Sequence, residues 1–136
     1  MVYITRRERF CAAHKLYRNE WSPEKNEEVF GPCSNPNWHG HNYEVCATIK
    51  GEPNPETGFV ANLKDLRDVM REIIVNRTDH KNLNLDVDFM QGILPSTENL
   101  AIAIWNELER PVRKLGAHLH CVKIVETENN VIEYYG

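Results

Sequence analysis

The chain has 136 residues, 41% of them hydrophobic, and a formal net charge of −4. This length predicts one domain over residues 1–136 with a modest core, and the absence of a lysine or arginine run argues against a nucleic-acid surface. No apolar run approaches the roughly 18 residues that span a bilayer. The four cysteines are scattered without a Cys-x-x-Cys pair, so we expect a reduced, cytoplasmic protein.

The N-terminal half contains two predicted strands separated by a long polar segment. Residues 2–13 mix β-branched and aromatic residues with charges and end at His14, a lone histidine that is either structural or a metal ligand. Residues 15–38 show little periodicity, so they form either a functional loop or a segment whose structure this pattern does not reveal. Within it, Ser22 followed by a proline favours one short helical turn. Residues 41–50 alternate apolar and polar side chains and predict a second strand.

A His-Gly-His sequence begins this second strand. In an extended backbone His39 and His41 point to the same side, about 6–7 Å apart at their Cα atoms, which suits two imidazoles on one metal ion. Histidines without a metal are the alternative, and a zinc site needs one or two further ligands. Cys33, folded back by an Asn-Pro-Asn turn, is either a metal ligand or a nucleophile or base beside the metal. The remaining cysteines are interpreted as small buried hydrophobes: Cys11, Cys46 and Cys121.

Two helices and two strands are predicted in the C-terminal half. Asn62 is a capping residue for an amphipathic helix over residues 61–75. A Pro-Ser-Thr-Glu segment at residues 95–98 begins a second helix, which Pro111 is expected to end. The predicted strands are residues 118–127 and 131–135, around a tight turn. This order predicts an α+β fold: a four-stranded antiparallel sheet with two helices on one face.

Three further polar groups have both a structural and a functional interpretation. Asp79 and His80 lie in a polar loop and form either a simple turn or part of a proton relay. Residues 95–98 are either only a helix cap or also a group of donors and a carboxylate for a ligand. Glu126 follows the apolar face of its strand and is either exposed at the rim or held in a pocket for an amidine-like partner.

Seven short segments, in this order and spacing, are similar to the 6-pyruvoyl-tetrahydropterin synthase family over essentially the whole chain. They are Ala12-Ala13-His14, Phe30-Gly31-Pro32-Cys33, Asn35-Pro36-Asn37, His39-Gly40-His41-Asn42-Tyr43, Asp79-His80-Lys81-Asn82-Leu83, Thr97-Glu98-Asn99 and Glu126-Thr127. The resemblance implies the tunnelling fold, in which three subunits close a twelve-stranded β-barrel and two trimers form a homohexamer. It also implies active sites at subunit boundaries.

The resemblance also implies a role for each matching residue. The implied zinc ligands are His14, His39 and His41. Cys33 resembles the catalytic base, with Asp79 and His80 as relay partners from a neighbouring subunit. Glu126 matches the carboxylate that binds the amino-pyrimidine edge of the pterin, and the substrate-anchoring segment matches Ser96, Thr97 and Glu98.

The implied reaction removes triphosphate from 7,8-dihydroneopterin triphosphate and gives 6-pyruvoyl-tetrahydropterin, the step used in tetrahydrobiopterin biosynthesis. Zinc would act as a Lewis acid, and Mg²⁺ is a reasonable companion of the triphosphate. Three positions depart from the pattern: Cys11 replaces a frequent serine, Ser96 a common threonine and Trp38 a frequent glycine. Trp38 is therefore expected to narrow the pocket.

Two other functions remain as alternatives. The related 6-carboxy-tetrahydropterin synthases of queuosine biosynthesis usually have three residues between the cysteine and the first histidine of the His-Gly-His motif. Five residues, 34–38, intervene here, which favours the pyruvoyl branch. The other alternative is a non-catalytic zinc module in which Cys33 and the three histidines close a tetrahedral site.

Overall fold

The computed structural model describes residues 1–136, which form an α+β fold around a five-stranded mixed sheet. The strands are β1 (Val2–His14), β2 (His39–Gly51), β3 (Lys81–Asn82), β4 (His118–Thr127) and β5 (Asn130–Tyr134), in the spatial order β3-β1-β2-β4-β5. The four long strands pair in antiparallel fashion, whereas β3 lies parallel to the end of β1. The predicted sheet of four antiparallel strands therefore lacked one strand. A two-residue strand has no alternating pattern that a sequence can reveal.

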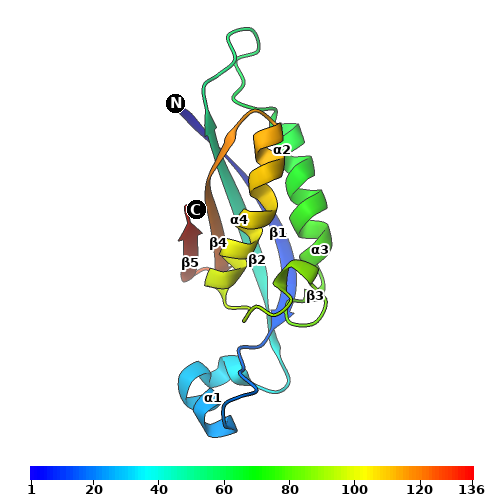
Figure 1. Ribbon diagram of the computed structural model, residues 1–136, viewed down its shortest axis with the longest axis vertical. Coiled ribbons are helices and arrows are strands. Elements are labelled where there is room, and N and C mark those ends of the chain that lie inside the picture. Colours follow the sequence, from blue (N-terminus) through cyan, green and yellow to red (C-terminus); the bar gives the residue numbers. More distant parts are fainter.

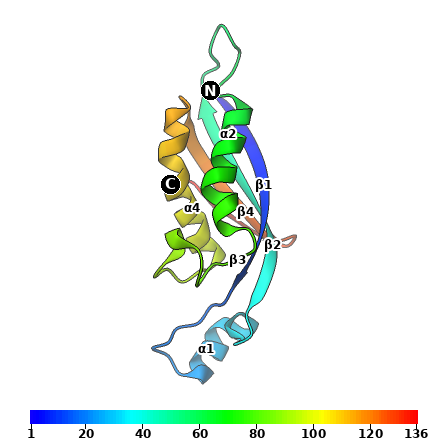
Figure 2. The ribbon, with the colours of Figure 1, turned by 90° about the vertical axis from the view of Figure 1, so that its right-hand side faces the viewer.

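Two long helical segments cover one face of the sheet, as predicted. Figure 2 shows α2 (Leu63–Met70) and α4 (Thr97–Lys114) on the same side of the strands. Asn62 caps α2 by accepting a hydrogen bond from the amide of Lys64 at 2.9 Å. A π-helical turn over Arg71–Val75 continues α2 into the short α3 (Asn76–Thr78). This helical segment therefore ends immediately before Asp79.

Helix α4 runs through the residue expected to end it. Its start is confirmed, because the Ser96 hydroxyl accepts a hydrogen bond from the amide of Asn99. Pro111 lies inside the helix, which continues to Lys114, so the predicted end was wrong. The fully buried side chains of Leu108 and Val112 flank this proline in the chain. Their burial favours a continued helix despite the lost backbone donor.

The long polar segment between β1 and β2 projects beyond the sheet and carries its own helix, α1 (Pro23–Phe30) (Figure 1). Ser22 caps α1, which confirms the predicted start, and a 3₁₀ turn over Gly31–Ser34 follows. Asn26, fully buried, holds the segment together through hydrogen bonds to both the amide and the carbonyl of Arg18. No local pattern in the sequence indicates these hydrogen bonds.

The hydrophobic core lies between the helices and one face of the sheet. Fully buried residues at helical spacing, Leu66, Met70 and Ile74, contribute from the first helical segment, and Ile104 and Leu108 contribute from α4. No helix covers the other face of the sheet (Figure 2). None of the helices has the length and apolar character needed to cross a bilayer.

Candidate metal centre

Three histidines meet where β1 ends and β2 begins. The antiparallel register places His14 opposite His39 and Ala12 opposite His41. Because side chains alternate along a strand, His39 and His41 share a face. One candidate ligand atom from each of the three rings lies within 4.8 Å of the other two. The predicted same-side arrangement of the His-Gly-His pair is confirmed, and this group of three could hold a metal ion.

The nitrogens of this histidine group fit a cation because several lack any other partner. Buried and without a hydrogen bond are Nε2 of His14, Nδ1 of His39 and Nε2 of His41. Buried polar atoms are normally paired, so unpaired nitrogens facing one another indicate a ligand. His14 Nδ1 donates to the carbonyl of Pro95 at 2.8 Å. Since a carbonyl only accepts, His14 presents the lone pair of Nε2 to the group.

Burial also favours the uncharged imidazoles that metal binding requires. Desolvation lowers the pKa of His14, with the neighbouring His39 and His41 adding to the effect. Desolvation likewise lowers the pKa of His39, together with the charge that His41 would carry. At neutral pH these rings are therefore neutral and able to coordinate.

Glu126 lies beside the histidine group rather than at an exposed rim. Its Oε1 accepts a hydrogen bond from the Thr97 hydroxyl at 2.8 Å and lies 3.6 Å from His41 Nε2. Its side chain is 19% exposed. The other members of the predicted anchoring segment differ: the Ser96 hydroxyl caps α4, and Glu98 is exposed. Of that segment, only Thr97 forms a hydrogen bond with Glu126.

Asp79 and His80 contact each other, but within one chain their thiol neighbour is Cys11. Asp79 Oδ2 lies 2.9 Å from His80 Nδ1, and Asp79 Oδ1 accepts a hydrogen bond from the Cys11 amide at 2.9 Å. This amide is the main cause that lowers the pKa of Asp79, followed by His80. Cys11 is only half-buried, so its interpretation as a core residue was wrong, whereas Cys46 and Cys121 are buried.

Cys33 lies apart from this Asp-His pair. It sits in the 3₁₀ turn after α1, and its carbonyl accepts a hydrogen bond from the amide of Leu16 at 2.9 Å. None of the hydrogen bonds of Asp79 or His80 reaches Cys33. Within one chain, therefore, no hydrogen bond joins Cys33 to the Asp-His pair.

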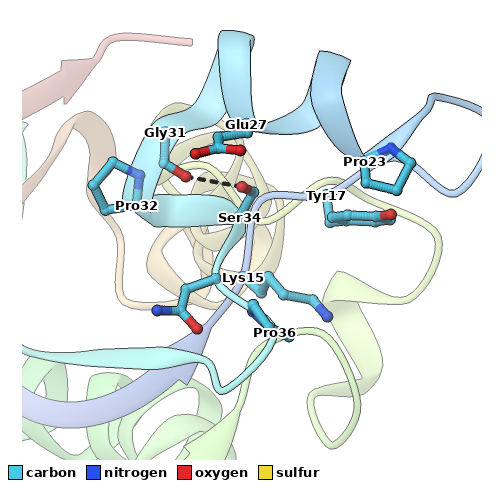
Figure 3. A pocket seen from close by; sticks show the side chains of 9 residues that line it. Lys15, Tyr17, Pro23, Glu27, Gly31, Pro32, Ser34 and Pro36 are labelled. Atoms are coloured by element: carbon cyan, nitrogen blue, oxygen red, sulfur yellow. Dashed lines mark hydrogen bonds between the residues drawn. The ribbon is translucent and has the colours of Figure 1, made fainter.

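Two cavities border this part of the molecule. The larger, about 910 Å³, lies below the sheet beside α1, and Figure 3 shows Lys15, Tyr17 and Glu27 among its lining residues. A second cavity of about 490 Å³ is lined by both His41 and His80. This second cavity is the one nearer to the candidate site, because its lining includes one residue of the histidine group and one of the Asp-His pair.

Two aromatic residues near the histidines have unusual environments. Tyr43 is fully buried, yet its hydroxyl has no hydrogen-bond partner, and burial strongly raises its pKa. Trp38 has a positive φ of 66°, a conformation that is costly for a side chain of this size but not for the glycine that is frequent at this position in the pattern it departs from. Lys15 Nζ lies 4.6 Å from the centre of the Trp38 ring.

Comparison with known proteins agrees with this arrangement. The family described as 6-pyruvoyl tetrahydropterin synthase matches residues 3–136. The 6-pyruvoyl tetrahydrobiopterin synthases of Pongo abelii and Homo sapiens are 47% and 46% identical over 133 residues, which cover 98% of this chain and 90% of each relative. The structure of Caenorhabditis elegans 6-pyruvoyl tetrahydropterin synthase has a TM-score of 0.91 and 36% identity, and the match covers 99% of this chain and 95% of that one. The chain therefore belongs to the 6-pyruvoyl tetrahydropterin synthase family.

Proposed function

We propose that the protein is a zinc-dependent lyase that converts 7,8-dihydroneopterin triphosphate to 6-pyruvoyl-tetrahydropterin and releases triphosphate. The observation that carries this proposal is the group of unpaired, buried nitrogens on His14, His39 and His41 next to the Glu126 carboxylate. Family membership provides the reaction, and this group provides a place for the metal. The five residues between Cys33 and His39 favour the pyruvoyl product over the carboxy product.

Zinc suits the donor set of the histidine group. Three neutral imidazoles with a fourth position left open are typical of catalytic zinc, whereas structural zinc is enclosed by four protein ligands. When bound, the metal would polarise substrate oxygens and acidify neighbouring protons. The hydrogen bond from His14 to Pro95 fixes the orientation of one ligand before any metal arrives.

Glu126 is the proposed anchor for the pterin. A carboxylate can accept two parallel hydrogen bonds from an amino-pyrimidine edge. The Thr97 hydroxyl already holds one of its oxygens at 2.8 Å and so limits rotation of the side chain. Ser96 and Glu98 complete the proposed anchoring segment at the start of α4, where the helix dipole favours anionic groups. Mg²⁺ would accompany the triphosphate.

Proton transfer is assigned to Cys33, Asp79 and His80. Cys33 as thiolate would remove a substrate proton, and His80, oriented by Asp79 at 2.9 Å, would return one elsewhere. The separation of Cys33 from this pair within one chain supports a site shared between subunits. We propose a cytoplasmic homohexamer, a dimer of trimers closed by β-barrels, in which residues 1–136 act as one domain. The uncovered sheet face and the largely unpaired outer edge of β1 support this assembly.

The decisive experiment incubates the zinc-loaded protein with 7,8-dihydroneopterin triphosphate and identifies the products by mass. We expect pyruvoyl-tetrahydropterin and triphosphate from the wild type and from the control Cys46→Ala. Cys33→Ala should retain zinc and fold but lose turnover. Carboxy-tetrahydropterin with acetaldehyde would instead assign the queuosine reaction. Loss of both zinc and fold in Cys33→Ala would support a structural zinc module.

A further inference from the structure

Outside the histidine group, a second set of metal-ligating side chains meets at the edge of the sheet. We propose that Cys11, Asp79 and His80 form a separate binding site for a divalent cation with affinity for sulfur, such as Zn²⁺ or Cd²⁺. One ligand atom from each residue lies within 4.8 Å of the other two. Thiolate, carboxylate and imidazole are all ligands of zinc, and three of them leave a fourth position open.

The backbone holds this set of three residues together, so the site does not depend on flexible side chains meeting by chance. The amide of Cys11 donates to Asp79 Oδ1 at 2.9 Å, and the amide of His80 donates to the Cys11 carbonyl at 2.7 Å. Cys11 and Asp79, which the first of these hydrogen bonds joins, are 68 positions apart in the chain. The turn after α3 is therefore fastened to β1 at the residue that supplies the sulfur.

His80 adopts a backbone conformation that places its ring at this edge. Its φ is 60°, a left-handed value that is unfavourable for a residue with a side chain. Within a single chain its ring is 81% exposed. Strained residues that persist in a well-bonded turn frequently mark functional positions. The cavity of about 490 Å³ provides access to both Cys11 and His80.

This second site is distinct from the histidine group. Cys11 and His14 are three positions apart on one strand, so their side chains point to opposite faces of the sheet. The register gives the same result, since Cys11 pairs with Asn42 and His14 with His39. The donor sets differ as well, because the histidine group contains no sulfur.

Binding at this site changes the bonding of the Asp-His pair. The Cys11 thiol would lose its proton to solvent as the sulfur coordinates the ion. The 2.9 Å contact between Asp79 and His80 would be replaced by bonds from each residue to the ion. Given the proposed function, this ion would inhibit turnover, because it removes both residues from the proton relay.

Cobalt titration of the metal-free full-length protein tests the proposal. Co²⁺ replaces zinc and shows a sulfur-to-cobalt charge-transfer absorption only where a thiolate is a ligand. We expect two Co²⁺ per wild-type chain and a clear charge-transfer band. Cys11→Ser should bind one Co²⁺ without the band, whereas the control Cys33→Ser should retain both ions and the band. A band that persists in Cys11→Ser or disappears in Cys33→Ser would overturn the proposal, as would one Co²⁺ per wild-type chain.

Turnover in the same titration tests the inhibitory consequence. Wild-type activity should fall as the charge-transfer band grows, and Cys11→Ser should keep its activity in excess metal. Inhibition of Cys11→Ser at the same metal concentration would contradict the proposed link to the relay. If no variant turns over the pterin, the proposed function fails, while metal stoichiometry and the band still decide whether the second site exists.

Discussion

Replacing Tyr43 with phenylalanine should stabilise the metal-free protein, although tyrosine to phenylalanine changes usually remove a useful hydrogen bond. The Tyr43 side chain is fully buried on β2, and its hydroxyl has no partner in the chain. A buried polar group without a hydrogen bond costs about 1–3 kcal/mol. Phenylalanine preserves the ring, which stacks against Phe10 at a centroid distance of 5.1 Å. Tyr43→Phe should therefore recover most of that cost.

The corresponding shift in unfolding temperature follows from chain length. An unfolding entropy of about 2.1 cal/mol/K per residue, applied to 136 residues, gives about 3–4 °C for each kcal/mol. We expect Tyr43→Phe to raise the midpoint by about 3–10 °C. Urea unfolding with a chelator, at one fixed protein concentration, measures the same free energy without a contribution from metal.

An exposed tyrosine provides the control for this experiment. Tyr3 is 52% exposed, so Tyr3→Phe should change stability by no more than about 0.5 kcal/mol. A Tyr43→Phe protein that is less stable than wild type by about 1 kcal/mol would refute the reasoning. That result would mean that the hydroxyl is paired in solution.

Three further predictions concern the loop, the ligands and the glycine between them. Asn26→Ala should destabilise the protein by about 1–3 kcal/mol in urea unfolding, because the partly buried amide and carbonyl of Arg18 lose their partner; unchanged stability would contradict this. In the metal-free protein, His39 binds a proton more readily in the unfolded chain than in the folded one, because folding lowers its pKa. The stability of the folded protein should therefore decline as pH falls through about 6.5. His39→Gln should flatten that decline and the exposed His118→Gln should not; equal slopes in both variants would be the contrary result. Gly40→Ala should weaken metal binding by about tenfold or more in a competition titration. The new Cβ would lie 3.1 Å from the Ala12 carbonyl oxygen and push apart the strands that hold the histidines. Unchanged affinity would show that β1 moves aside without disturbing the histidines.

The sequence predicted the parts of this molecule that depend on local pattern. Caps at Ser22, Asn62 and Ser96 begin the three main helices where the side chains indicated. The same face for His39 and His41 followed from the two-residue period of a strand. The family resemblance then implied that His14 and Glu126 lie near this pair of histidines, and both do so in the structure.

The features that the sequence did not reveal depend on contacts between distant segments. The Cys11 amide meets the Asp79 carboxylate across 68 residues, and no local pattern announces that pairing. Burial of Asn26 similarly results from how its loop closes on Arg18. Pro111 misled the prediction because its local cost is outweighed by packing of the surrounding helix against the sheet. Tertiary contacts thus decided these cases.

The hydrogen bond between His14 and the Pro95 carbonyl has a consequence for the order of folding. It joins residues 81 positions apart, and the other two histidines come from a different strand again. Closing a loop of that size costs chain entropy before the contacts between its ends can stabilise the protein, so such contacts form late in folding. The complete three-histidine pocket therefore exists only once the sheet and the start of α4 have come together. Metal bound in this pocket should therefore slow unfolding far more than it accelerates folding.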